Sequence, residues 1–173
     1  MMQTNTADTK FQTIIKPPAS EWALPPNMTD YDAMRTDFSW DTIAKGLNLP
    51  RKNGVNQGTI CIDEHPPEVM QRNALIWVSG DHQHTETYTF EQLKTLSNQF
   101  ANALTTLGVE QGDRVFTFLE RVPEHFVSVF GVLKVGAVVG PLFSAFGPEA
   151  IKDRLADSEA KVVVTSAALK ERL

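Results

Sequence analysis

The stretch RVFTFLERVPEHFVSVFGVLKVGAVVGPLFSAFGPEAIKDRLADSEAKVVVT, residues 114–165, decides the fold of this protein. Short apolar runs within it predict strands over residues 114–119, 137–143 and 161–165. Residues 123–135 and 148–157 lie between these runs, and both segments begin with a proline, which is frequent at the first position of a helix. Strands this continuously apolar are usually buried on both faces, as in a parallel sheet. The stretch therefore predicts an α/β fold with a short, mainly parallel sheet flanked by helices.

Upstream of this stretch, the sequence predicts a β-hairpin followed by a long amphipathic helix. Residues 74–79 (ALIWVS) form an apolar run, and residues 85–89 return with alternating character after a Gly-Asp-His turn. Thr89 has the position of a helix N-cap, with Gln92 three residues further on, as a capping box requires. Apolar residues then recur at helical spacing until Gly108 ends the helix.

Residues 1–57 predict an irregular N-terminal arm. Its Pro-Pro pairs at positions 17–18 and 25–26 interrupt regular helix and favour extended backbone. Short helices are expected over residues 30–36 and 39–46, the second with Ser39 as its N-cap. The arm also carries several aromatic side chains, which is unusual for a disordered tail. These are Trp22, Tyr31, Phe38 and Trp40. We therefore expect the arm to lie across a larger body, with its rings as anchors.

The character of the sequence changes at Gly58, and we place the domain boundary between residues 57 and 58. A helix broken by Pro66-Pro67 is expected over residues 59–72. Residues 58–173 then read as a partial α/β domain, because three parallel strands make a thin sheet and the last predicted helix has barely begun at Ser166.

Composition and charge exclude several classes of protein. Of the 173 residues, 42% are hydrophobic and 21% charged, as in an ordinary globular protein. A net charge of -5 argues against nucleic acid and against an anionic membrane surface as partners. The polar start lacks the pattern of a secretory signal, and the most apolar run, residues 126–143, is interrupted by Lys134 and by glycines. Cys61 is the lone cysteine, which fits a reducing compartment, so we expect a cytoplasmic protein.

Several motifs follow one another in order from Tyr88 to the end of the sequence. They are Tyr88-Thr89-Phe90, Leu107-Gly108-Val109-Glu110-Gln111-Gly112-Asp113-Arg114-Val115, Pro123-Glu124, Leu133-Lys134-Val135-Gly136-Ala137-Val138-Val139, Pro141 to Ala150, and Arg154 to Ser158. This series resembles the N-terminal subdomain of the large domain of adenylate-forming acyl-CoA synthetases, and it is most similar to acetyl-CoA synthetases. Tyr31-Asp32, Phe38-Ser39-Trp40 and Ala74 to Trp77 resemble the N-terminal extension of acetyl-CoA synthetases and the strand that follows it, so the resemblance covers residues 28–173.

The resemblance implies a two-step ligase that uses acetate or another short-chain acid, ATP, Mg²⁺ and coenzyme A. The carboxylate attacks ATP to give an acyl-adenylate and pyrophosphate, and the coenzyme A thiolate then displaces AMP. The family's catalytic motifs all lie C-terminal to the position of Leu173. They are the phosphate-gripping loop, the Tyr-Gly-x-Thr-Glu motif, the ribose-binding Asp and the catalytic Lys. The sequence itself has no Gly-rich phosphate loop. We therefore expect a truncated N-terminal part of the enzyme, without catalytic residues, that does not adenylate a substrate by itself.

One candidate site follows from the predicted sheet. Residues 143–147 join a strand to the helix that begins at Pro148. Open parallel sheets bind ligands beyond the carboxyl ends of their strands, near helix N-termini whose N–H groups favour anions. The resemblance implies that Phe143, Ser144, Ala145 and Phe146 form a wall of the coenzyme A nucleotide pocket. It also implies that Lys170 or Arg172 helps to hold a coenzyme A phosphate.

The residues of the turn differ from the pattern that the resemblance leads us to expect. Many acetyl-CoA synthetases have Phe-Gly-Gly-Phe at the turn, and the loss of two glycines restricts φ and limits close approach of a ligand to the backbone. Arg154 is expected to form a surface ion pair with Asp157 rather than to bind a ligand. We predict no metal site, because His82 and His84 lack a visible third ligand.

Two alternatives to a segment of the ligase remain open from the sequence. A stand-alone module could bind coenzyme A or an adenine nucleotide without turnover. An interaction protein could instead form a homodimer, or pair with the rest of the enzyme. The contact would use an exposed edge strand such as residues 161–165, or the uncovered face of the helix predicted over residues 123–135.

Overall fold

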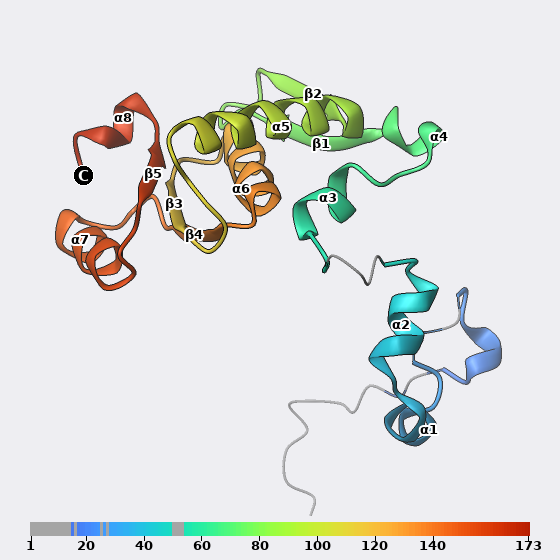
Figure 1. Cartoon of the computed structure of the whole chain (residues 1–173). Coiled ribbons are helices and arrows are strands. Elements are labelled where there is room, and N and C mark those ends of the chain that lie inside the picture. Colours follow the sequence, from blue (N-terminus) through green and yellow to red (C-terminus); the bar gives the residue numbers. More distant parts are fainter. Residues whose placement is uncertain (1–14, 16, 25, 27, 50–53) are drawn as a thin grey trace, which may run out of the picture. The chain divides into compact units, whose positions relative to one another are not determined.

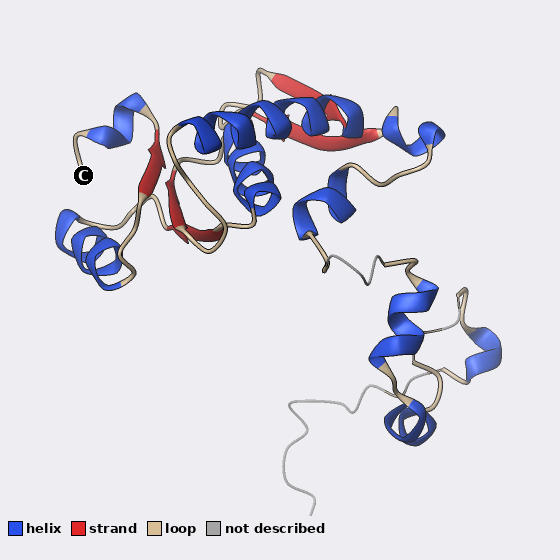
Figure 2. Cartoon of the chain, viewed as in Figure 1, coloured by secondary structure: helices blue, strands red, loops and turns tan. Residues whose placement is uncertain are grey.

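The computed structural model describes residues 15, 17–24, 26, 28–49 and 54–173. Two compact units make up the chain, Met1–Leu49 and Pro50–Leu173. Their elements are labelled in Figure 1 and coloured by type in Figure 2. The domain boundary predicted between residues 57 and 58 stays a prediction.

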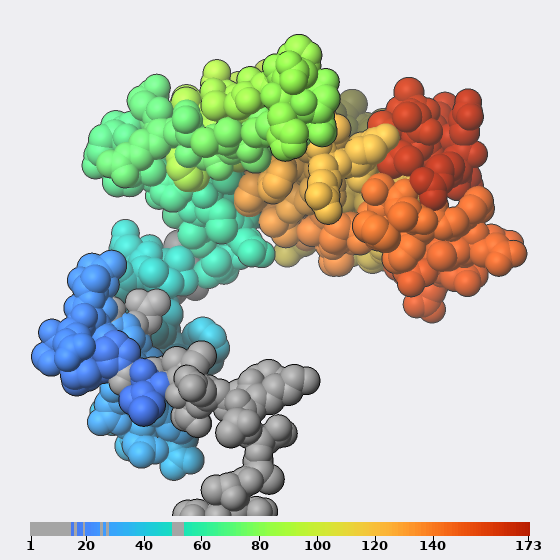
Figure 3. Space-filling model, turned by 180° about the vertical axis from the view of Figure 1, so that it is seen from behind, coloured from blue at the N-terminus to red at the C-terminus, as the bar shows by residue number. Residues whose placement is uncertain are grey.

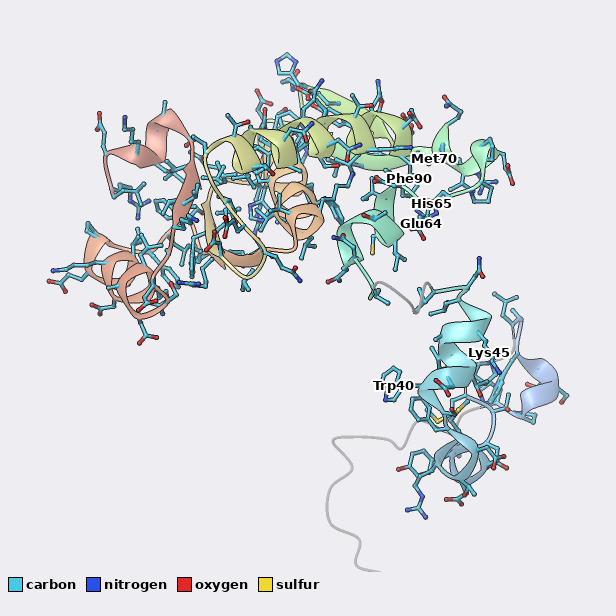
Figure 4. The ribbon with its side chains drawn as sticks, viewed as in Figure 1. Trp40, Lys45, Glu64, His65, Met70 and Phe90 are labelled. Atoms are coloured by element: carbon cyan, nitrogen blue, oxygen red, sulfur yellow. The ribbon has the colours of Figure 1, made fainter. Side chains whose placement is uncertain are left out.

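The first unit contains short helices, and the longer two are capped by side chains of the residues that precede them. They are η1 (Ala19–Glu21), α1 (Tyr31–Asp37) and α2 (Trp40–Gly46). The side chain of Asp30 accepts a hydrogen bond from the Ala33 amide at the start of α1, and Ser39 caps α2 as predicted. No residue of α1 or α2 is buried, and the Trp40 side chain, labelled in Figure 4, is 77% exposed. The expectation that this arm lies across a larger body stays a prediction.

The second unit holds the sheets and the longer helices. Its elements are α3 (Gln57–Ile62), α4 (Pro67–Met70), β1 (Asn73–Val78), β2 (Thr85–Thr89), α5 (Phe90–Thr106), β3 (Arg114–Phe118), α6 (Pro123–Val135), β4 (Val138–Leu142), α7 (Pro148–Asp157), β5 (Val162–Thr165) and α8 (Ala167–Lys170). The predicted α/β fold and the predicted hairpin are both confirmed. Among the described residues, no helix combines the length and the apolar character needed to cross a bilayer.

The main sheet is parallel, with β3 between β4 and β5. Phe118 pairs with Leu142 on one side and with Thr165 on the other, so all three strands end at the same level. The expectation of burial on both faces holds for the middle strand but is wrong for the outer strands. Val115, Thr117 and Phe118 of β3 are fully buried, whereas Val138 of β4 is 54% exposed and every residue of β5 is half-buried. The reason is that β4 and β5 each pair with β3 alone among the described strands.

Each face of the parallel sheet is covered by its own pair of helices. On one face, Val115 packs with Leu104 of α5 and Val132 of α6. On the other, Phe118 packs with Ile151 of α7 and Leu169 of α8. Figure 3 shows α7 and α8 side by side, in orange and red, as they also lie in Figure 1. This two-sided burial follows from the period-two alternation of side chains along β3.

The hairpin of β1 and β2 leads directly into α5 through a complete capping box. The Thr89 side chain accepts from the Gln92 amide, and the Gln92 side chain accepts from the Thr89 amide. Just upstream, the His65 ring packs edge-on against Phe90 at 4.6 Å between ring centroids, and Met70 is buried nearby (Figure 4). The loop between α3 and α4 is thereby fixed against the start of α5.

A buried ammonium group joins α3, α5 and α6. Lys134 Nζ donates to Asp63 Oδ1 at 2.7 Å, to Ser97 Oγ at 2.8 Å and to Asn98 Oδ1 at 2.7 Å. The side chains of Lys134 and Asp63 are only 6% and 17% exposed. An ammonium group carries three donors, so these short bonds use all of them.

Asn56 and Gly58 bring α3 close enough to α6 for this cluster to form. The Asn56 amide group donates to the carbonyl oxygens of Leu133 and Lys134 at 3.0 and 3.1 Å, and its Oδ1 accepts from the Thr59 amide. One side chain therefore caps the end of α6 and the start of α3. A Cβ atom added at Gly58 would lie 2.9 Å from both Phe130 O and Lys134 Cγ, so the contact admits only glycine.

We expect Lys134→Met to lower the free energy of unfolding by about 3 kcal/mol, because it leaves the Asp63 carboxylate mostly buried without its cation. Urea denaturation of the purified chain measures this loss. The double variant Lys134→Met/Asp63→Leu should recover most of it, since an apolar pair leaves no unpaired charge. A double variant as unstable as Lys134→Met alone would contradict the assigned pairing.

We expect Gly58→Ala to destabilise the second unit by about 2 kcal/mol, because the added methyl group overpacks against the backbone of α6. Gly80→Ala is the matched control, since Gly80 is exposed and an added Cβ there would meet no atom within 4 Å. Its effect should stay within about 0.5 kcal/mol. Equal melting temperatures for the two variants would argue against the close contact of α3 with α6.

Candidate active site

The candidate site is built at the common carboxyl end of the parallel strands. A cleft of about 370 Å³ opens there, lined by the loop after β3, the turn after β4, the first turn of α6 and a side chain of the hairpin. Its lining includes Trp77, Glu120, Arg121, His125, Phe126 and Phe143. Parallel α/β sheets bind their ligands at this edge, and pockets of this size hold small molecules.

The loop after β3 is tied to two other parts of the second unit. Trp77 Nε1 on β1 donates to the Arg121 carbonyl oxygen at 2.7 Å. The Glu120 carboxylate accepts a hydrogen bond of 3.0 Å from Ser166 Oγ, which also accepts from the Leu169 amide as the N-cap of α8. Sequence reasoning missed Trp77 and Glu120 as lining residues, because both contacts join segments more than 40 residues apart.

The turn over residues 143–146 connects β4 to α7, as predicted. The Phe146 amide donates to Phe143 O at 2.9 Å and closes the turn. Neither Ser144 nor Ala145 adopts a positive φ, so the turn accommodates both side chains without left-handed backbone strain. The Phe143 ring is 64% exposed and meets the Phe146 ring edge-on at 5.9 Å.

Two arginines hold this turn. Arg172 Nη1 donates to Ser144 O at 2.7 Å, and Arg172 Nη2 donates to Phe146 O at 2.6 Å. The Arg154 guanidinium lies over the Phe146 ring, 4.4 Å from its centroid, and donates to Ala150 O. The expected ion pair of Arg154 with Asp157 is wrong, because no ion pair within 4.0 Å joins these two described residues and Arg154 reaches the aromatic ring instead.

Only part of the predicted set of site residues comes together. Phe143, Ser144, Phe146 and Arg172 form one connected group. Ala145 is exposed on the same turn, and Lys170 is exposed at the end of α8. Whether these residues bind a ligand stays a prediction. In the part of the chain that the structure describes, no group of three or more His, Cys, Asp or Glu side chains could hold a metal ion.

One titratable group that lines the cleft is His125 on the first turn of α6. Burial lowers the pKa of its imidazole, because desolvation disfavours the charged form. Glu120 and Arg121 line the same cleft and carry opposite charges. His125 therefore favours its neutral form in the folded protein.

We expect the second unit to lose stability as the pH falls below about 6.5, the ordinary pKa of histidine. The lowered pKa of His125 means that the unfolded chain binds this proton at a higher pH than the folded protein does. The loss should continue until the pH passes below the pKa of the folded protein. Urea denaturation at pH 8 and at pH 5.5 measures it, and His125→Gln should lose less stability between the two pH values. The same pH dependence in the variant would assign the effect to other groups.

The fold and the cleft define a class of protein: an α/β protein with an open parallel sheet and a cleft at the carboxyl ends of its strands. Residues 62–173 match the family described as "AMP-binding enzyme". This match covers more than half of the chain, which therefore belongs to the AMP-binding enzyme family.

The relatives agree with this assignment. The chain is 40% identical to an acetyl-coenzyme A synthetase of Bacillus subtilis over 148 residues, which is 85% of this chain and 26% of that protein. It is 34% identical to the acetyl-coenzyme A synthetase of Pseudoalteromonas translucida over 159 residues, or 90% of this chain and 25% of that protein. The crystal structure of Brucella canis acyl-CoA synthetase superimposes with a TM-score of 0.72 at 36% identity, covering 82% of this chain and 26% of that one. The chain thus spans about a quarter of the length of these relatives.

Proposed function

We propose that this chain forms the N-terminal part of an acetate–CoA ligase, which makes acetyl-CoA, AMP and pyrophosphate from acetate, ATP and coenzyme A through acetyl-adenylate. The observation that carries this proposal is the match to acetyl-coenzyme A synthetases over most of the chain. Within this enzyme, residues 1–57 act as an N-terminal arm and residues 58–173 as part of the adenylate-forming domain. The enzyme works in the cytoplasm on small molecules, without nucleic acid or membrane as a partner.

In this proposal, the turn over residues 143–146 is a wall of the coenzyme A pocket. The exposed Phe143 ring offers a flat apolar surface to a purine, and the adjoining cleft has room for part of the ligand. Ser144, Ala145 and Phe146 shape the wall, while Lys170 and Arg172 supply positive charge beside it. Bound coenzyme A supplies the thiol that takes up the acyl group. These residues fit a role in binding and orienting the ligand.

We assign no step of adenylation to this chain. Activation of a carboxylate by ATP needs the phosphate groups held in line and their charge neutralised. The sequence offers no Gly-rich phosphate loop, and the described residues offer no cluster of carboxylates for Mg²⁺. ATP and Mg²⁺ therefore belong to the proposed full enzyme, and the 173-residue chain alone is inactive in this proposal.

We expect the purified chain to show no acetate-dependent ATP–pyrophosphate exchange above background, with or without coenzyme A and Mg²⁺. Coenzyme A titration should nevertheless quench the fluorescence of Trp77, which lines the cleft. The titration uses a chain that carries both Trp22→Phe and Trp40→Phe, so that the fluorescence comes from Trp77 alone. Phe143→Leu should weaken binding about tenfold, the loss of one base-stacking contact.

Phe38→Leu is the matched control, since Phe38 is a similarly exposed ring in the first unit. It should leave the affinity unchanged. Clear acetate-dependent exchange would overturn the assignment of the chain as inactive by itself. The absence of saturable quenching would overturn the assignment of the coenzyme A wall.

A second candidate function is association through the edges of the parallel sheet. β4 and β5 each pair only with β3 among the described strands, so their outer edges are open to another chain. In this reading, the partner is a second copy of the chain or a further part of the enzyme. A mass that rises with concentration in analytical ultracentrifugation supports the second copy, and a monomer at all concentrations rejects it.

A further inference from the structure

Arg172 binds the turn after β4 in a geometry that differs from the one expected of a phosphate ligand. Both terminal nitrogens of its guanidinium donate to the protein itself, to Ser144 O and Phe146 O at 2.7 and 2.6 Å. A guanidinium normally grips a phosphate or carboxylate with two parallel N–H groups. Here such a pair is already used, on two carbonyl oxygens of the same turn.

The surroundings of Arg172 keep it in this position. Its guanidinium lies 5.6 Å from the centroid of the Phe118 ring, which is fully buried at the end of β3. Its backbone amide donates to Leu169 O, and the Leu169 side chain packs in the same cluster as Phe118. The side chain is half-buried between the sheet and the turn, so its charge faces carbonyl dipoles.

The two carbonyls that Arg172 binds lie on either side of Ala145. Together with the hydrogen bond from the Phe146 amide to Phe143 O, they fix both halves of the turn. The Phe146 ring is held in addition by Arg154 on one side and by the edge of Phe143 on another. The orientation of the exposed Phe143 ring therefore depends on contacts that begin at Arg172.

We propose that Arg172 is a positioning residue, which presets the turn over residues 143–146 before the ligand arrives and does not itself bind the ligand phosphate. The effect of Arg172 on ligand binding rests on the proposed coenzyme A wall. The claim that Arg172 fixes the turn does not depend on any ligand. Lysine cannot replace arginine here. The planar fork of the guanidinium spans both carbonyl oxygens, whereas the single nitrogen of an ammonium group does not.

The test compares coenzyme A with 3′-dephospho-coenzyme A, which lacks one phosphate, on the wild-type chain and on Arg172→Lys. A positioning residue should raise both dissociation constants by the same factor, about tenfold, and leave their ratio unchanged. Lys152→Ala is the matched control, because Lys152 is an exposed cation on α7 and lies outside the proposed wall. If the dissociation constants of Arg172→Lys for coenzyme A and for 3′-dephospho-coenzyme A became nearly equal, the proposal would be overturned and Arg172 would be a phosphate ligand.

Hydrogen exchange without any ligand provides the second measurement. In Arg172→Lys, the Phe146 amide should exchange faster, by about tenfold or more, because its hydrogen bond to Phe143 O loses its support. Lys152→Ala should leave this rate unchanged. An unchanged rate in Arg172→Lys would overturn the proposal. If no chain binds coenzyme A, the proposed wall fails, whereas the exchange rates still decide the role of Arg172.

Discussion

The parallel pairing of β3 with both β4 and β5 is the constraint on which the rest of the second unit depends. It brings the ends of the three strands to one level, so the loops after them meet at one edge of the sheet. Several contacts of the candidate site bridge segments that follow different strands or join one of these loops to the hairpin. Glu120 reaches the residue after β5, and Arg172 reaches the turn after β4. The sheet thus brings segments that are distant in sequence together as the lining of one cleft.

The helices that cover this sheet are fixed by a different kind of interaction. Lys134 places a charge in a nearly dry position between α3, α5 and α6, where its cost is offset by three short hydrogen bonds. These hydrogen bonds fix the position of the helices relative to one another, whereas apolar contacts alone would let the helices slide. The first turn of α6 borders the cleft, so the cluster at the other end of this helix sets the position of His125 and Phe126.

The sequence predicts most of the elements because their ends carry local signals. Proline opens α6 and α7 at the predicted residues, and Gly136, with a φ of 79°, ends α6. The candidate turn was also predictable, since it follows from the order of strand and helix. The contacts of Arg172, Arg154 and Trp77 were not, because each depends on which segments the sheet brings together. Arg154 illustrates the limit: helical spacing favours Asp157, but the Arg154 guanidinium lies over the Phe146 ring of the folded turn.

The composition of the turn bears on how a ligand could be recognised there. Positions 144 and 145 are not glycine, so two Cβ atoms limit how closely any ligand could approach the backbone of the turn. A turn without glycine also loses less conformational entropy on folding, which favours a preset shape. The exposed Phe143 ring can serve as a flat surface only if its orientation is fixed, and Phe146 fixes it through an edge-on contact. Arg154 and Arg172 in turn hold Phe146, so the orientation of the Phe143 ring depends on both arginines.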